Sequence, residues 1–405
     1  MWDPSFRARG VGGSVGPIAE SGAGGERRRH PAPRRHGTPG RRRPRRRRWD
    51  RCAPNWLGGG TRVGVPTLEE VARAAGVSRA TASRVVNGSP TVGIDVRQSV
   101  ERAIAQLGYV PNRAARSLVT RRNDSVGVVI AEPTGRIFGD PFFLEVLRGI
   151  SAALGSRQIQ LVLVMSQSLD EERRAERYLT GGHVDGVILF SLHGDDPLPA
   201  HLQSHGIPVV VGGEPPRGAR VSYVDNDNHG GAVAAVRHLI DQGRTQIATI
   251  TGPWDMPAGV TRLLAYREAL RAAGVAHDPD LEEGGGFTRE GGRHAMEVLL
   301  GRCPDIDGVF AASDLMAAGA LSTLHAAGRR VPEDVAVVGF DDSILALSTQ
   351  PPLSSVRQSM EVMGRELVSV LLQAIDARDP LVRRVVLGTE LIVRQSSGGP
   401  PTGKS

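Results

Sequence analysis

From residue 123 onward, short apolar runs alternate with longer amphipathic stretches. Seven such runs occupy positions 125–131, 159–165, 185–191, 207–213, 246–252, 307–313 and 335–342. A continuous apolar run is typical of a strand buried on both faces, and helical spacers between such strands indicate parallel pairing. The pattern therefore predicts an α/β architecture, in which ligands bind beyond the carboxyl ends of the strands.

The segment before these runs has a helical period instead. In 68–75 the apolar residues lie on one helical face. Thr67 and Glu70 have the spacing of a capping box, and Gly76 is a typical residue at a helix end. These features predict a short helix over 68–75.

A second short helix is predicted over 79–87, with Ser78 at its N-terminus, and a third over 94–107. Two short helices joined by a glycine-containing turn form a helix-turn-helix, whose second helix enters the major groove of DNA. Small side chains on that helix allow close approach, and arginine can donate two hydrogen bonds to guanine. By periodicity alone, an ordinary solvated helix face is the alternative interpretation.

Two motifs resemble the LacI/GalR family of bacterial transcription regulators. They are PTLEEVARAAGVSRATASRVVNG at 66–88 and LGYVPNRAARSLVT at 107–120, and the resemblance extends to residue 397. It implies an N-terminal all-α helix-turn-helix head, followed by a two-lobed α/β sensor of periplasmic-binding-protein type I architecture. It also implies a sequence-specific, ligand-responsive regulator, commonly a repressor of sugar or related catabolic genes.

In the head, the expected DNA contacts are concentrated at the start of the second helix. They are Thr67, Leu68, Ser78, Arg79, Ala80, Thr81, Ser83, Arg84 and Asn87. Of these, Arg79, Ala80 and Arg84 are expected at base edges. Thr81, Ser83 and Asn87 are expected at phosphates. Gly93 stands where family members usually have a serine cap, which should weaken phosphate contacts slightly.

After the head, the resemblance implies a hinge helix that enters the minor groove at the centre of the operator. The expected contacts in this segment are Asn112, Arg113, Ala115 and Leu118. Leu118 would insert between central base pairs and kink the duplex; a leucine packed on its own domain is the alternative. The hinge helix, expected over Asn112 to Thr120, has nine residues. This is fewer than the roughly 12–15 that a stable isolated helix needs, so we expect the segment to become ordered only on DNA.

In the sensor, the residues after several apolar runs match the ligand pocket of the family. The implied effector contacts are Phe142, Phe143, Arg262, Phe287, Ser313 and Asp341. Arginine offers a planar donor fork to hydroxyls or a carboxylate, and aromatic rings offer stacking faces, although they can equally be plain core.

Five nearby residues have less certain assignments. Asp314 is expected to cap the following helix. Asp225 and Asp227 can be structural or ligand-binding. Trp254 and Asp255, in a loop that varies within the family, can add to the pocket.

Charge is distributed unevenly and changes this picture little. Residues 1–60 carry 15 arginines and four acidic residues, whereas the remaining 345 residues hold 35 basic and 39 acidic ones. The extension over 1–62 is rich in Arg, Pro and Gly and is predicted to be disordered. It is either an arm that binds DNA phosphates or a segment upstream of the natural start, for which Val63 and Val65 are candidates.

Other features exclude several classes of protein. Two cysteines cannot form a disulfide framework or a cysteine metal cluster, and no run has the 18 apolar residues of a membrane helix. The sequence lacks nucleophile, zinc-protease and phosphate-loop motifs. A dehydrogenase is therefore disfavoured, as is an exported sugar-binding protein, which would need a signal peptide and no head. We expect no enzyme, no cofactor and no metal.

The prediction thus has five segments and two partners. The helix-turn-helix domain spans 63–110, the hinge 111–122 and the effector-binding and dimerisation domain 123–397, with a disordered tail over 398–405. Because no heptad repeat follows residue 397, we expect a homodimer that reads a near-palindromic double-stranded operator. The expected effector is a small molecule of the sugar class, and the expected location is the cytoplasm.

Overall fold

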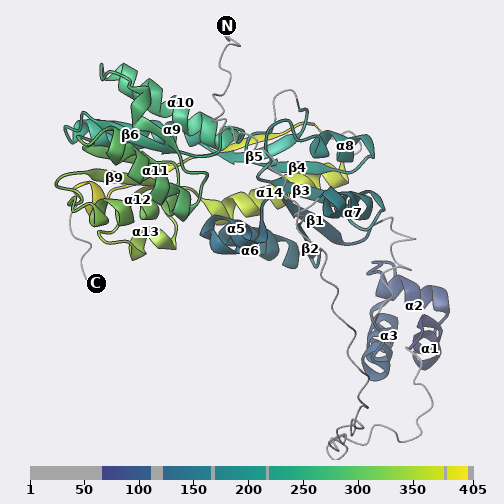
Figure 1. The fold of residues 1–405 in the computed structure, drawn as a ribbon. Coiled ribbons are helices and arrows are strands. Elements are labelled where there is room, and N and C mark those ends of the chain that lie inside the picture. Colours follow the sequence, from purple (N-terminus) through teal and green to yellow (C-terminus); the bar gives the residue numbers. More distant parts are fainter. Residues whose placement is uncertain (1–65, 111–121, 166–168, 216–218, 378–380, 400–405) are drawn as a thin grey trace, which may run out of the picture. The chain divides into compact units, whose positions relative to one another are not determined.

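A computed structural model describes residues 66–110, 122–165, 169–215, 219–377 and 381–399 (Figure 1). The predicted hinge contacts at Asn112, Arg113, Ala115 and Leu118 lie outside these residues. In the part of the chain that is described, no helix is long and apolar enough to cross a membrane.

The head consists of the three predicted helices: α1 (Leu68–Ala74), α2 (Arg79–Val86) and α3 (Ile94–Leu107). Their shared core is small: Val71, Ala72, Ala82, Val85, Val100 and Ala103. The capping box of Thr67 and Glu70 is formed in both directions. Ser78 caps α2 by accepting a hydrogen bond from the Thr81 amide at 3.1 Å. Gly93 begins α3 without a side-chain cap, as the sequence predicted.

The sensor contains two sheets of mainly parallel strands, and each sheet is the centre of one lobe. The sheet of the N-terminal lobe has the order β11-β5-β4-β3-β1-β2 and is parallel throughout. Its strands are β1 (Ser125–Ile130), β2 (Gln160–Met165), β3 (Gly186–Phe190), β4 (Val209–Gly212), β5 (Ser222–Asn226) and β11 (Arg384–Leu387). Its helices are α5 (Thr134–Gly139), α6 (Pro141–Gly155), α7 (Leu169–Thr180), α8 (Leu198–Ser204) and α14 (Met360–Asp376).

The sheet of the C-terminal lobe has the order β12-β10-β9-β8-β6-β7, and only β12 within it is antiparallel to its neighbour. Its strands are β6 (Ile247–Thr251), β7 (Glu282–Gly284), β8 (Gly308–Ala311), β9 (Ala336–Asp341), β10 (Ser354–Arg357) and β12 (Glu390–Ile392). Its helices are α9 (Asn228–Asp241), α10 (Pro257–Ala272), α11 (Arg289–Arg302), α12 (Asp314–Ala326) and α13 (Ile344–Ser348), with 3₁₀ turns at Pro279–Leu281 and Gln395–Ser397.

The chain passes between the lobes three times, after β5, after β10 and after β11. Helix α14 therefore packs on the N-terminal lobe although it follows a strand of the other lobe. Its contact with α6 is close because each helix contributes a glycine. A Cβ at Gly149 of α6 would lie 2.2 Å from the Glu361 carbonyl oxygen, and one at Gly364 of α14 would lie 2.3 Å from that of Val146. This packing fixes the second crossover against the N-terminal lobe.

All seven predicted strands are confirmed, but five others were not predicted. Two of these, β7 and β12, have only three residues each. Strand β10 reads SSVR, and its serines are buried through hydrogen bonds rather than apolar packing: Ser354 Oγ donates to the Arg394 carbonyl oxygen at 3.0 Å. Such a strand carries no hydrophobic signal. The predicted fold class, a helical head with a two-lobed α/β sensor, is confirmed.

Candidate effector pocket and DNA-reading helix

One pocket lies at the carboxyl ends of strands from both lobes. All six residues predicted as effector contacts line it: Phe142, Phe143, Arg262, Phe287, Ser313 and Asp341. The structure thus brings together side chains that are up to about 200 positions apart in the sequence. Their role in effector binding stays a prediction.

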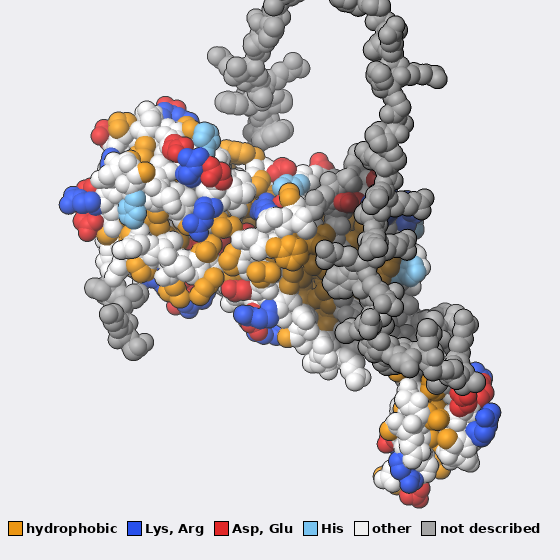
Figure 2. Space-filling model, turned by 60° about the horizontal axis from the view of Figure 1, so that its bottom comes forward, with side chains coloured by type: hydrophobic (Ala, Val, Ile, Leu, Met, Phe, Trp, Pro, Cys, Tyr) orange, Lys and Arg blue, Asp and Glu red, His pale blue; other side chains and the backbone are white. Residues whose placement is uncertain are grey.

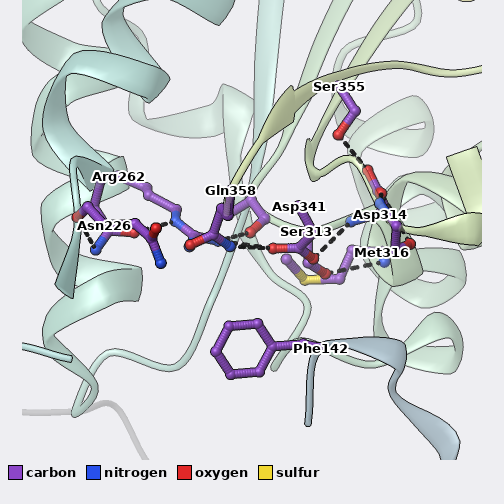
Figure 3. Close-up of polar contacts among 12 residues, drawn as sticks. Phe142, Asn226, Arg262, Ser313, Asp314, Met316, Asp341, Ser355 and Gln358 are labelled. Carbon is purple, nitrogen blue, oxygen red and sulfur yellow. Dashed lines mark hydrogen bonds and ion pairs between the residues drawn. The ribbon is translucent and has the colours of Figure 1, made fainter. Parts of the chain in front are cut away.

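Arg262, on α10, is the central cation of the pocket and is buried (Figure 3). Its Nε donates to Asn228 Oδ1 at 2.9 Å, and one terminal nitrogen, Nη1, donates to the Ala312 carbonyl oxygen at 2.6 Å. The same Nη1 lies 3.9 Å from Asp341 Oδ1, and the guanidinium stacks on the Phe340 ring at 3.6 Å. The guanidinium is therefore held rigidly, with a preset geometry for a ligand.

Asp341 ends β9 in an unusual backbone conformation, with φ of 116°. Gln358 Nε2 donates to its Oδ1 at 2.6 Å. Burial raises the pKa of Asp341 well above the usual range, although the nearby Arg262 charge opposes this shift. Hydrogen-bond donors from a ligand would stabilise the charged carboxylate.

The prediction that Asp314 caps the next helix is wrong. The N-cap of α12 is Ser313, whose Oγ accepts from the Met316 amide at 3.3 Å. The buried Asp314 carboxylate instead accepts from the Ser343 amide at 2.7 Å and from Ser355 Oγ at 2.6 Å. Burial raises its pKa to about 7. Asp314 therefore ties β10 and the turn after β9 together behind the pocket.

The aromatic residues belong both to the pocket and to the cores of the lobes. Phe142 and Phe143 meet edge to face with ring centroids 5.3 Å apart, and Phe143 is part of the N-terminal lobe's core. Phe287 is part of the other core and takes a φ of 55°. A Cβ at Gly252 would lie 2.2 Å from this ring, so a glycine is required there. These rings therefore both line the pocket and pack in the cores of the lobes, and their contact with an effector stays a prediction.

Of the two aspartates left open by the sequence, one caps a helix and one faces the pocket. Asp227 accepts from the Gly230 amide at 2.8 Å and caps α9. Asp225 lines the pocket, and burial raises its pKa to about 6. In the other open pair, Trp254 is 59% exposed, and Asp255 contacts His193 of the opposite lobe at 3.0 Å; neither lines the pocket.

Sequence reasoning missed several pocket residues: Arg136, Asp140, Glu214, Asn226, Asn228 and Gln358. Asn226 is the most informative, because it is buried and its Oδ1 has no hydrogen-bond partner among the described residues. A buried acceptor without a partner is costly, and a donor from a ligand or an ordered water would satisfy it. Asn226 ends β5 and Gln358 follows β10, at two of the crossovers between the lobes. The apolar runs predicted neither of these strands, so that signal could not have located the two residues.

In the head, the exposed face of α2 carries the predicted DNA contacts. Arg79, Ala80, Arg84 and Asn87 are exposed, whereas Thr81 and Ser83 are half-buried. Arg79 forms an ion pair with Glu69 of α1 at 2.5 Å, so this side chain is held near the start of α2. The hydroxyl of Thr67 is already used in the capping box, and Leu68 packs against the core.

These features together define a regulator with a DNA-reading head and a two-lobed sensor. Residues 67–112 match the lacI family of bacterial regulatory proteins, and residues 236–397 match the periplasmic binding protein-like domain. The chain belongs to the lacI family. It is a helix-turn-helix transcriptional regulator, and the prediction that it is not an enzyme is confirmed.

Two relatives align with this chain over almost the whole of their own length. The chain is 53% identical to the HTH-type transcriptional regulator CelR of Thermobifida fusca over 82% of this chain and 98% of that protein. It is 33% identical to the ribose operon repressor of Escherichia coli K12 over 82% and 99%.

Two solved structures extend the comparison to three dimensions, and each covers 82% of this chain and 99% of the other. One is a CelR–cellobiose complex, with a TM-score of 0.66 and 50% identity. The other is a lac repressor dimer bound to operator and an anti-inducer, with a TM-score of 0.72 and 25% identity.

Proposed function

We propose that this regulator binds a near-palindromic operator as a homodimer and that cellobiose, or a closely related β-linked glucose disaccharide, is its effector. The observation that carries this proposal is the convergence of the six predicted contacts in one pocket between the lobes. The 50% sequence identity to a regulator whose structure was solved in complex with cellobiose supports the choice of sugar. The sugar would contact both lobes and so change operator affinity through their relative arrangement.

The charge of the pocket favours an uncharged sugar. Four carboxylates line it, from Asp140, Glu214, Asp225 and Asp341, against the two guanidinium groups of Arg136 and Arg262. Carboxyl groups thus outnumber guanidinium groups in the pocket wall, which favours a neutral sugar over a phosphorylated or acidic one. Neutral hydroxyls can donate to these carboxylates and to Asn226 Oδ1, and the aromatic rings can cover the apolar face of a glucose unit.

Calorimetric titration of the full chain with cellobiose, maltose, glucose, ribose and glucose 6-phosphate tests the effector assignment. We expect cellobiose to bind at least about tenfold more tightly than the other four sugars and to change the affinity for operator DNA, measured by fluorescence anisotropy. Binding of ribose in preference to cellobiose would replace the assignment, and a cellobiose complex with unchanged operator affinity would contradict the regulatory part.

Effector binding should weaken as the pH falls below about 6. The raised pKa of Asp225, about 6, means that a sugar hydroxyl donating to its carboxylate has to displace a proton at lower pH. Affinity is then lost progressively as the pH falls below about 6. Calorimetry at several pH values checks this. The Asp225→Asn variant should show a shallower decline; equal slopes for both proteins would remove Asp225 from the contact.

A candidate surface for the second copy lies on the face that carries α5, α6 and α13, where apolar side chains gather (Figure 2). Exposed apolar residues there include Phe138, Leu144, Ile344 and Leu347. Ile344 and Leu347 lie three positions apart, on one face of α13. An exposed apolar patch of this kind is typical of a protein interface.

Introducing charge on α13 should therefore disrupt the dimer. For Ile344→Asp combined with Leu347→Asp, we expect at least a tenfold weaker dimer in sedimentation velocity, because two carboxylates would be buried without partners. Leu264→Asp on α10, which replaces a comparably exposed leucine, serves as the control and should leave dimerisation unchanged. An unchanged dimer in the α13 variant would assign the patch to another role.

A further inference from the structure

A chain of polar contacts runs from the pocket to the opposite lobe, and it starts at Arg136. This residue lies on α5 of the N-terminal lobe, lines the pocket, and places its guanidinium 5.5 Å from the ring centroid of Phe287 in the C-terminal lobe. Its Nη1 contacts Glu132 Oε1 at 2.6 Å. Its Nε is buried and has no hydrogen-bond partner among the described residues. Arg136 is thus tied on one side and free to donate on the other.

The same carboxylate oxygen continues the chain toward the other lobe. The side chain of Glu132 is 3% exposed, and its Oε1 lies 3.3 Å from His193 Nε2. The other ring nitrogen, Nδ1, lies 3.0 Å from Asp255 Oδ2, in the loop that joins β6 to α10 of the C-terminal lobe. The Gly194 amide also donates to the Asp255 carbonyl oxygen at 2.8 Å. Two adjacent residues therefore hold Asp255 across the cleft.

We propose that Glu132, His193 and Gly194 form an interlobe latch that closes on Asp255, and that Arg136 couples this latch to the pocket by donating its Nε–H to the bound sugar. The coupling to a sugar rests on the proposed function, whereas the latch itself does not. None of these residues was predicted as an effector contact from the sequence, and only Asp255 was considered as an addition to the pocket.

The latch follows from linkage between closure and binding. Contacts between His193 and Asp255 exist only when the lobes are close together, so they favour the closed arrangement. A sugar that touches both lobes favours the same arrangement. Removing the latch must then weaken sugar binding by the factor by which it shifts the equilibrium between open and closed lobes. For a partly exposed pair of this kind that factor is about two- to fivefold.

A double-mutant cycle with cellobiose as the probe tests the latch. We expect His193→Ala and Asp255→Ala each to weaken binding about two- to fivefold, and the double variant to lose little more than either single one. The His229–Glu268 pair, at 3.0 Å and similarly exposed but confined to α9 and α10 of one lobe, is the matched control. Its Ala variants should bind cellobiose like the wild type. Additive losses in the first cycle, or equal losses in the control, would overturn the latch.

Arg136→Lys tests the coupling to the pocket. Lysine keeps the positive charge beside Glu132. It lacks the guanidinium Nε–H, which has no acceptor among the described residues and is the group that we assign to the sugar. We expect about tenfold weaker cellobiose binding, with the thermal unfolding midpoint nearly unchanged. An affinity equal to that of the wild type would show that Arg136 does not contact the sugar, and the proposal would then be reduced to the latch alone.

A measurement without any ligand separates the latch from the choice of sugar. Hydrogen–deuterium exchange of the peptide that contains Gly194 reports on the amide that crosses the cleft. In His193→Ala this amide should exchange faster than in the wild type, and the His229→Ala control should leave it unchanged. If the wild type fails to bind cellobiose, the effector assignment fails while this test still stands. Unchanged exchange in His193→Ala would overturn the latch whatever the sugar.

Discussion

Asp341→Asn abolishes the response to effector while operator binding in the absence of effector is retained; this is the largest effect that we expect in the sensor. The carboxylate accepts from Gln358 and faces Arg262 across 3.9 Å, so it is the charged acceptor best placed for sugar hydroxyls. Hydrogen bonds to a charged group are worth about 1.5–3 kcal/mol each, and losing one or two of them corresponds to at least about a tenfold loss of affinity.

The same substitution should leave the fold intact. Burial already disfavours the charged form of Asp341, so replacing it with a neutral amide of the same shape removes a desolvation cost as well as a favourable contact. Calorimetry with cellobiose, anisotropy with operator DNA and a thermal unfolding curve check the three parts. If the effector changes the operator affinity of this variant as much as it changes that of the wild type, Asp341 is not an effector contact.

Arg84→Ala in the head should weaken operator binding by about 1–3 kcal/mol and relax the base preference in each half-site. Arg84 is exposed on α2 at a position suited to a bidentate contact with guanine. Arg73→Ala, which removes an equally exposed arginine from the last turn of α1, is a matched control. We expect it to change affinity less and to leave base preference unchanged.

Binding to a library of half-site variants distinguishes the possible roles of Arg84. A loss concentrated at one or two base pairs is expected. A uniform loss over all sequences, together with a reduced dependence on salt, would instead assign Arg84 to a phosphate.

Much of the fold could be predicted because its strands carry strong apolar runs. The head was also predictable, since Thr67, Glu70 and Ser78 encode their caps locally. The strands that were missed owe their stability to partners far away in the sequence: Ser354 of β10 is buried only because Arg394 and Ser396 return to meet it. No local pattern can carry that information.

For the pocket, family resemblance located the six predicted residues, but the chemistry of the remaining wall depends on the tertiary structure. Asp225 and Asp227 are two positions apart and look alike in sequence, yet one lines the pocket and the other caps α9. Likewise, Ser313 rather than its acidic neighbour caps α12, because the carboxylate of Asp314 finds Ser343 and Ser355 instead. Competition among nearby partners, not residue type, decides such roles.

The crossovers between the lobes have a practical consequence for biosensor design. Asn226 and Gln358 sit at two of the three passages and also line the pocket, so any exchange there alters ligand fit and lobe motion together. Phe142 and Glu214 line the same pocket from within the N-terminal lobe. Libraries that retune this regulator to a new effector should therefore diversify these wall positions first. The side-chain amides of Asn226 and Gln358 should stay unchanged, so that the response of the lobes survives the change in ligand.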